Sequence, residues 1–158
     1  MDNNKPEKHI VTASATIPAR RERVYSLIAN YKDGHPRILP KQFSGLAVEQ
    51  GGVGAGTVIR FQMSVFGRKQ TFRAAITEPE PGRVLVETDL DTNGAVTRFT
   101  VDPGAAPADS RVTISTELPV RGGFLGKIER QLSTLLLRPV YARELQNLAR
   151  VATGPFGS

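Results

Sequence analysis

The stretch GFLGKIERQLSTLLLRPVYARELQNLARV, residues 123–151, decides the fold of this chain. As an α-helix, its roughly 29 residues would form a rod about 43 Å long. Apolar side chains recur at helical spacing and predict a single stripe, which consists of Leu125, Ile128, Leu132, Leu135, Leu136, Leu145 and Leu148. Pro139 predicts a kink near Leu135, because proline removes a backbone hydrogen bond and clashes with the preceding turn. Such a helix needs a surface that covers its stripe.

The start of the chain predicts one strand and one short helix. Residues 9–17, HIVTASATI, alternate small or apolar side chains with hydroxyl side chains, which predicts a half-buried strand. Pro18 ends this strand, and residues 19–31, ARRERVYSLIANY, place apolar side chains at helical spacing. The expected buried positions are Val11, Ala13, Ala15 and Ile17 on the strand and Val24, Leu27, Ile28 and Tyr31 on the helix. Residues 32–41, KDGHPRILPK, hold two prolines and a glycine and allow at most one broken helical turn.

From Phe43 to Leu118 the apolar side chains recur with a period of two, and turn residues interrupt them at the intervals of an antiparallel meander. Strands are expected at 57–66, 68–77, 83–90, 95–101 and 111–118. Their inward-facing residues are predicted to be Ile59, Phe61, Met63, Val65, Phe72, Ala74, Ile76, Val84, Val86, Thr88, Thr97, Phe99, Val101, Val112, Ile114 and Thr116. The whole pattern predicts a sheet of about seven antiparallel strands.

This order of elements predicts an α+β fold, in which a curved seven-stranded antiparallel sheet wraps around the long C-terminal helix. A curved sheet cannot close fully on a straight helix, so the arrangement leaves room for a cavity. At 158 residues the chain is large enough to bury one core. We therefore expect a single domain over residues 8–151, with one or two short helices after the first strand and flexible ends at residues 1–7 and 152–158.

The composition excludes several classes of site and partner. The chain has no cysteine, which excludes disulfides, thiolate metal sites and cysteine nucleophiles. Its polar start and its lack of a long apolar run predict a cytoplasmic protein. The formal net charge is +6, but the basic residues are dispersed along the chain, which argues against specific nucleic-acid binding.

The outer face of the last helix is predicted to be basic. It carries Lys127, Arg130, Arg138, Arg143 and Arg150 against only Glu129 and Glu144. A solvated face is one interpretation, and a transient contact with an anionic membrane surface is the other. The sequence leaves the oligomeric state open, with a monomer favoured.

The sequence has no recognisable catalytic, cofactor or metal motif. It lacks a G-x-S-x-G nucleophile motif, and neither GGVGAG at 51–56 nor GGFLGK at 122–127 has the spacing of a nucleotide-binding loop. His9 and His35 are far apart and lack the carboxylates of a metal triad, so we expect structural or surface roles for both. The sequence therefore assigns no catalytic residue, no metal site and no cofactor.

The candidate ligand site consists of inward-facing residues of the sheet and of the helix stripe. The apolar candidates are Phe61, Met63, Phe72, Phe99, Ile114, Leu132 and Leu136, which either line a cavity or form an ordinary core. Thr88, Thr97 and Thr116 are predicted to face inward as well. Buried hydroxyls need partners, so these threonines either bond to backbone carbonyls or orient an oxygen of the ligand.

Five stretches carry a resemblance to a known superfamily. They are ASATIPARRERVYSLIANY, HPRILP, GVGAGTVIRFQM, ITEPEPGRVLVE and the closing helix, within residues 8–151. With these features the chain resembles the START-like (SRPBCC) superfamily, which includes the polyketide cyclase/dehydrase and lipid-transport family and the birch pollen allergen proteins. The resemblance implies a helix-grip arrangement that holds lipids, polyketides, sterols or quinones between sheet and helix.

These observations favour the binding or transport of a small hydrophobic molecule, with burial of apolar ligand surface supplying about 25 cal/mol per Å². The alternative is a polyketide cyclase/dehydrase-type enzyme acting on an aromatic or polyketide substrate. In such an enzyme a shaped cavity positions a reactive chain and a polar side chain moves protons. A third class, a protein-interaction module, would use the outer sheet face or the basic helix.

Overall fold

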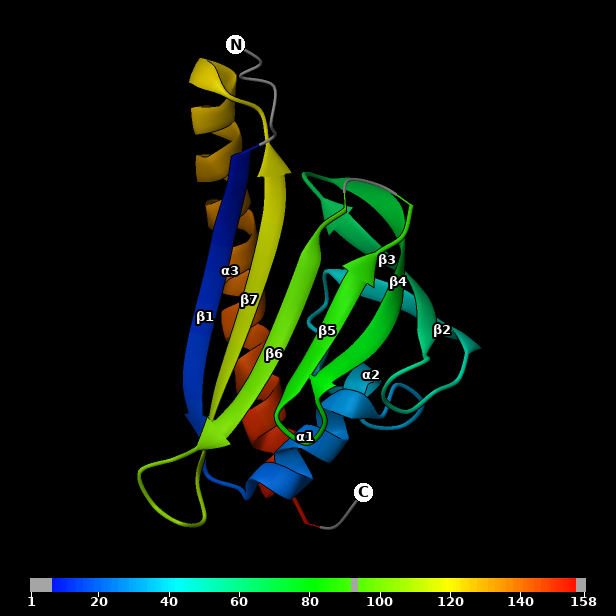
Figure 1. Ribbon diagram of the computed structural model, residues 1–158, viewed down its shortest axis with the longest axis vertical. Helices are drawn as coiled ribbons and strands as arrows, with labels where there is room; N and C mark the ends of the chain where they lie inside the picture. The colour runs from blue at the N-terminus through cyan, green and yellow to red at the C-terminus, as the bar shows by residue number, and fades with distance from the viewer. Residues whose placement is uncertain (1–6, 92–93, 156–158) are drawn as a thin grey trace.

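The computed structural model describes residues 7–91 and 94–155 of the chain. Its elements are β1 (Glu7–Ile17), α1 (Arg21–Ala29), α2 (His35–Ile38), β2 (Phe43–Gln50), β3 (Val58–Val65), β4 (Arg68–Glu80), β5 (Val84–Asp89), β6 (Val96–Pro103), β7 (Ser110–Val120) and α3 (Gly123–Thr153). The strands form one antiparallel sheet in the order β1-β7-β6-β5-β4-β3-β2. The predicted α+β fold, with a seven-stranded sheet packed on a long C-terminal helix, is confirmed (Figure 1).

The first and last strands lie side by side and support the helix. β1 pairs with β7 along its whole length, from Glu7 opposite Val120 to Ile17 opposite Ser110. β7 leads directly into α3, which turns back and packs against both strands (Figure 1). The helix is therefore held at one side of the sheet, while β2, β3 and β4 form the other side.

The structure extends slightly beyond the predicted domain at both ends. β1 begins at Glu7, and α3 continues through Pro139 to Thr153. Of the other residues predicted to be flexible, 154–155 follow the helix, and 1–6 and 156–158 lie outside the described residues.

The alternation of apolar and polar side chains correctly predicts which face of most strands points inward. The confirmed inward residues are Val11, Ala13, Ala15, Ile17, Ile59, Phe61, Met63, Phe72, Ala74, Ile76, Phe99, Val101, Val112 and Ile114, all of which belong to or pack against the core. The side chain of Val65 is not among those that the structure describes. α1 buries Val24, Leu27 and Ile28 as predicted, Tyr31 is buried just after it, and α2 is the single short turn that the prolines allow.

The predicted face of β5 is wrong by one residue. Leu85 belongs to the core, and by alternation Glu87 and Asp89 share its face and point toward the helix side of the sheet. Val84, Val86 and Thr88 therefore lie on the opposite face. The error arises because Val84, Leu85 and Val86 are all buried, so the sequence there has no alternation that could set the phase.

The predicted single stripe of α3 is also wrong. Leu145 and Leu148 are buried, whereas Leu125, Ile128, Leu132 and Leu135 are exposed. At about 100° per residue the two sets fall on roughly opposite sides of the helix, so no single surface can cover both. The half of α3 after Pro139 is anchored in the core by Val140, Tyr141, Leu145, Leu148, Val151 and Ala152.

None of the helices in the described part of the chain combines the length and apolarity that a membrane crossing requires.

Candidate ligand-binding cavity

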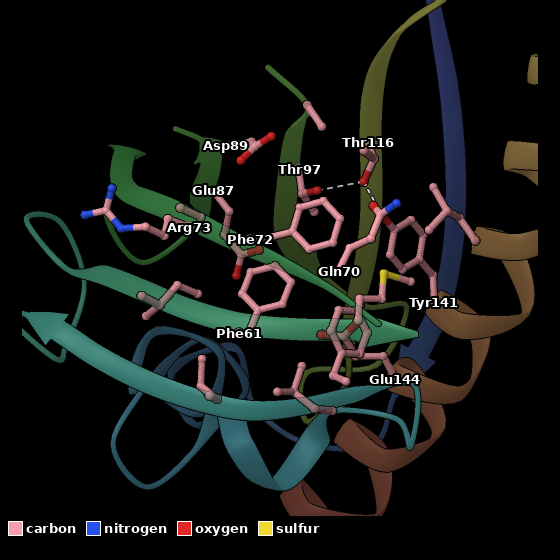
Figure 2. Close-up of a pocket in the computed structure, with 18 of the residues that line it drawn as sticks. Phe61, Gln70, Phe72, Arg73, Glu87, Asp89, Thr97, Thr116, Tyr141 and Glu144 are labelled. Atoms are coloured by element: carbon pink, nitrogen blue, oxygen red, sulfur yellow. Dashed lines mark hydrogen bonds between the residues drawn. The ribbon is translucent and has the colours of Figure 1, made fainter. Parts of the chain in front are cut away.

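A cavity of about 290 Å³ lies between the inward face of the sheet and α3. Its lining consists of His35, Leu39, Phe43, Leu46, Ile59, Phe61, Met63, Gln70, Phe72, Arg73, Ala74, Glu87, Asp89, Ala95, Thr97, Phe99, Thr116, Leu118, Ser133, Leu136, Leu137, Tyr141 and Glu144 (Figure 2). β2 to β7 and α3 all contribute, so the cavity exists because the curved sheet stands away from the helix.

One wall of the cavity is aromatic. Phe61 of β3 lies opposite Phe72 of β4 in the strand register, and their rings stack with centroids 5.5 Å apart. Phe43 of β2 extends the row, with its ring centroid 5.7 Å from that of Phe61. Three neighbouring strands thus present a continuous apolar surface suited to a flat or hydrophobic ligand body.

A chain of three hydroxyls forms a polar wall across from the aromatic row. Thr97 and Thr116 are register partners on β6 and β7, and their hydroxyl oxygens lie 2.8 Å apart. The Thr116 hydroxyl also lies 2.5 Å from the hydroxyl of Tyr141 on α3 (Figure 2). Burial raises the pKa of Tyr141 to about 12, so its hydroxyl keeps its proton at neutral pH.

A cluster of Tyr31, His35, Glu87 and Glu144, which we call the carboxyl–imidazole cluster, lies at the base of the cavity. The Tyr31 hydroxyl donates a hydrogen bond of 2.6 Å to the Glu87 carboxylate, and the Tyr31 and His35 rings stack with centroids 4.4 Å apart. His35 Nδ1 lies 2.8 Å from the carbonyl oxygen of Ile28. That carbonyl can only accept, so Nδ1 carries the proton and Nε2 is the nitrogen that faces the two glutamates.

Glu144 is the most unusual member of the cluster. It is buried, with 3% of its surface exposed, and its Oε1 lies 3.7 Å from His35 Nε2, while Glu87 Oε1 lies 3.6 Å from the same nitrogen. Burial raises the pKa of Glu144 well above its usual range, and the neighbouring Glu87 raises it further. The protonated form of Glu144 is therefore favoured, and in that form the carboxyl group can donate a hydrogen bond. Burial and the charge of Glu87 likewise raise the pKa of Tyr31.

Six of the nine predicted ligand-site residues line the cavity: Phe61, Met63, Phe72, Phe99, Thr116 and Leu136. The other three do not belong to its lining. Ile114 is enclosed in the core, Leu132 is exposed on α3, and Thr88 lies on the opposite face of β5.

The sequence reasoning missed the carboxyl–imidazole cluster. Glu144 was predicted on a solvated helix face and His35 in a structural or surface role, whereas both are buried and line the cavity. A signal for Glu144 was present, because it lies four residues from both Val140 and Leu148, on their side of the helix. A carboxyl group among such apolar neighbours indicates a functional position. His9 contacts Thr134 on α3 through its Nε2, at 2.8 Å.

The cluster does not have the arrangement of a metal site. Within residues 7–91 and 94–155, no group of three or more His, Cys, Asp or Glu side chains is placed to hold a metal ion.

Comparisons with known proteins agree with this architecture. The family model described as polyketide cyclase / dehydrase and lipid transport matches residues 8–153. The solution structure of the KanY protein is 28% identical, with a TM-score of 0.80 over 94% of this chain and 99% of that one. No curated protein sequence matches the chain.

Two further solved structures share the fold at lower identity. A START superfamily protein from Mycobacterium smegmatis is 16% identical, with a TM-score of 0.74 over 92% of this chain and 99% of that one. The Zhui aromatase/cyclase from Streptomyces sp. R1128 is 15% identical, with a TM-score of 0.76 over 92% of this chain and 94% of that one.

Proposed function

Because the chain belongs to the polyketide cyclase/dehydrase and lipid-transport family, we propose that it binds and carries a small hydrophobic molecule in the cavity between the sheet and α3. The observation that carries this proposal is the cavity itself, about 290 Å³ with an aromatic wall. Binding sites for small molecules are concave and mostly apolar, with a few polar groups that fix the orientation of the ligand. This space, with its aromatic wall and its hydroxyl and carboxyl groups, has that character.

The affinity would come mainly from burial of apolar ligand surface. At about 25 cal/mol per Å², roughly 200 Å² of buried apolar surface contributes about 5 kcal/mol. The hydroxyl chain and the carboxyl–imidazole cluster would orient the polar end of the ligand. The cavity volume favours compact members of the candidate classes, which are lipids, polyketides, sterols and quinone-like molecules.

Native mass spectrometry of protein purified without lipid stripping tests this proposal. We expect a mass above that of the polypeptide, which disappears on denaturation, and saturable binding of an apolar fluorescent probe by the stripped protein. A bare polypeptide mass together with no saturable probe binding would overturn the proposal.

The carboxyl–imidazole cluster favours a second candidate function, an enzyme of the cyclase/dehydrase type. Glu144, whose pKa is raised by burial and which lies beside a carboxyl group and an imidazole, is suited to general acid–base catalysis, because its protonated form can give a proton to a ligand oxygen in the cavity and later recover one. In that case Glu144→Gln would abolish turnover of a polyketide substrate while leaving its binding intact. Absence of turnover by the wild-type protein, with Glu144→Gln changing ligand binding alone, would favour a carrier.

We also propose that α3 contacts an anionic membrane surface during ligand exchange. Its N-terminal half exposes Phe124, Leu125, Ile128, Leu132 and Leu135, which we call the apolar face of α3. Phe124 is 77% exposed and Leu135 72%, so this face has no cover in the described part of the chain. At about 100° per residue these side chains lie on one side of the helix, and Lys127 and Arg138 flank them. An apolar strip beside exposed lysine and arginine suits the boundary of anionic headgroups and acyl chains.

The apolar face adjoins the cavity. Ser133 and Leu136 line the cavity and are the sequence neighbours of Leu132 and Leu135, which belong to the exposed face. A membrane that met this face would therefore lie next to the space that holds the ligand. The nearby carboxylates of Glu129 and Glu7 are engaged by Arg121 and Arg130, respectively, which limits their repulsion of an anionic surface.

A further inference from the structure

The polar end of the cavity is acidic. Its described lining includes the carboxyl groups of Glu87, Asp89 and Glu144, whereas the basic side chains there are Arg73 and His35. The question is whether either basic side chain is available to a negatively charged ligand. Their contacts indicate that neither is.

The guanidinium of Arg73 is engaged outside the cavity. Its Nε and Nη2 donate hydrogen bonds to Glu49 Oε2 at 3.0 and 2.8 Å, and its Nη1 donates to Asp91 Oδ1 at 3.3 Å. Figure 2 shows the guanidinium pointing away from Tyr141 and from the two threonines of the hydroxyl chain. The position of Arg73 in β4 agrees with this. Side chains alternate between the two faces of a strand, and Phe72 and Ala74, on either side of Arg73, face inward.

The imidazole of His35 is engaged as well. Its Nδ1 proton is directed at the Ile28 carbonyl, and its Nε2 already faces the carboxyl oxygens of Glu87 and Glu144. A positive charge on this ring would be balanced by the Glu87 carboxylate. No net positive charge is left to receive an anion.

The hydrogen-bonding groups that remain in the lining include the donors of the Gln70 amide and of the Ser133 hydroxyl, but acceptors outnumber donors. The three hydroxyls of Thr97, Thr116 and Tyr141 share two contacts between them, which occupy two of their three protons but leave several oxygen lone pairs. Carboxylate oxygens add further acceptors. A ligand head group that donates hydrogen bonds is satisfied here, whereas a carboxylate would lose its hydration and meet like charge.

We propose that the cavity selects apolar molecules whose head group donates a hydrogen bond and carries no negative charge, namely alcohols, phenols and amines, and that it excludes carboxylates of the same apolar size. This selectivity rests on the proposed ligand-binding function and adds the chemical class of the ligand. Free fatty acids are therefore poor ligands of this protein, although their chains suit the aromatic wall.

A matched set of probes tests the selectivity. Decanol, decylamine, methyl decanoate and decanoate share a chain and differ in the head group, and each can be titrated against a neutral fluorescent probe at pH 7.5. We expect decanol and decylamine to displace the probe at concentrations about tenfold or more below those of decanoate. Methyl decanoate, which has neither charge nor donor, should fall between them.

The outcomes separate the selectivity from the function. Decanoate that binds as tightly as decanol would overturn the selectivity and leave the carrier function standing. Failure of the fluorescent probe and of all four compounds to bind would overturn both.

Single substitutions test whether the carboxylates of the cavity cause the discrimination against decanoate. Glu87→Gln removes one charge but keeps a carbonyl oxygen that accepts the Tyr31 hydrogen bond, so we expect the discrimination against decanoate to fall several-fold. Glu117→Gln makes the same change of net charge on the exposed side of β7, where Glu117 pairs with Lys8 at 3.4 Å, and should leave the discrimination unchanged. If Glu87→Gln does not fold, Asp89→Asn, nearer the end of β5, tests whether loss of a carboxylate charge from the cavity lining weakens the discrimination against decanoate. Equal discrimination in the cavity variant and in Glu117→Gln would contradict the proposal.

Discussion

Glu87 of β5 and Glu144 of α3 approach the same atom, Nε2 of His35, at 3.6 and 3.7 Å. The sheet and the C-terminal helix are therefore joined at the base of the cavity by ionisable groups as well as by apolar packing. Burial first, and the nearby Glu87 carboxyl group second, favour the protonated form of Glu144, because two carboxyl groups this close to one another cannot both hold a negative charge at low cost.

Stability should depend on pH through Glu144. Its pKa is raised by burial in the folded state but is near 4.5 in the unfolded state, so the folded protein binds more protons above that pH. The free energy of unfolding should therefore fall as pH rises above about 4.5 towards the raised folded-state pKa, by at most about 1.4 kcal/mol per pH unit. The groups that interact with Glu144 are His35, Glu87, Tyr31 and Tyr141. Chemical denaturation at several pH values measures the slope.

Glu144→Gln provides the control for that pH dependence. The amide resembles the protonated carboxyl group and does not titrate, so the variant should show a flatter profile and should gain stability relative to wild type at pH 8. Glu117→Gln, on the exposed side of β7, should keep the wild-type profile. A wild-type profile in Glu144→Gln would show that another group is responsible.

Met63→Trp should distinguish a cavity from a packed core. Met63 lines the cavity, so the larger ring can enter free space, leave stability near its original value and block the probe. Ile114→Trp is the matched control, because Ile114 is 1% exposed and lies in the core. Overpacking there should cost about 1–3 kcal/mol. Denaturant midpoints measure the stability of each variant, and probe titrations measure its binding. A Met63→Trp variant that is destabilised and still binds the probe would place Met63 in the ordinary core.

Thr116→Val should break the hydroxyl chain. It removes the partner of both Thr97 and Tyr141, and the buried Tyr141 hydroxyl is costly to leave unpaired. We expect a loss of about 1–3 kcal/mol in the free energy of unfolding and weaker binding of decanol. Thr88→Val, on the opposite face of β5, should leave decanol binding unchanged. Equal effects of the two variants on decanol binding would remove the hydroxyl chain from the ligand site.

The apolar face of α3 should bind anionic vesicles. Cosedimentation with vesicles of phosphatidylcholine and phosphatidylserine should exceed that with phosphatidylcholine alone and should weaken in high salt. Phe124→Ser with Leu135→Ser should reduce binding about tenfold or more. Val53→Ser is the control, since Val53 is exposed between β2 and β3. Binding that survives the double substitution, or a change of oligomeric mass on introducing it, would show that the face serves another purpose.

The sequence was sufficient to predict the fold because most strands alternate clearly. In β3, Ile59, Phe61 and Met63 share one face with polar residues between them, and burial of that face fixes the register. β5 was misread because both of its faces are buried over Val84 to Val86, so no polar residue marks the outer side.

The cavity was predictable only in part. Its apolar lining follows from alternation, as for Phe61 and Phe72, but its acidic base does not. Charged residues are usually solvated, so Glu144 was assigned to the outer face of the last helix. Glu87 was left out of the site because Val84, Val86 and Thr88 were predicted to face inward on β5. The burial of Glu87 and Glu144 depends on the tertiary packing of β5 against α3, which no local pattern contains.

Pro139 divides the backbone of α3 into two hydrogen-bonding segments. Proline has no amide proton, so the Leu135 carbonyl lacks its helical partner at the level of the cavity. The trailing segment carries the buried Tyr141 and Glu144, whereas the leading segment carries the exposed Phe124 and Leu135. Amide protons of the leading segment should therefore exchange with solvent sooner than those of the trailing one. The interrupted hydrogen-bond ladder therefore lets the part of α3 that carries the apolar face loosen, while the part that carries the cavity-lining Tyr141 and Glu144 stays ordered.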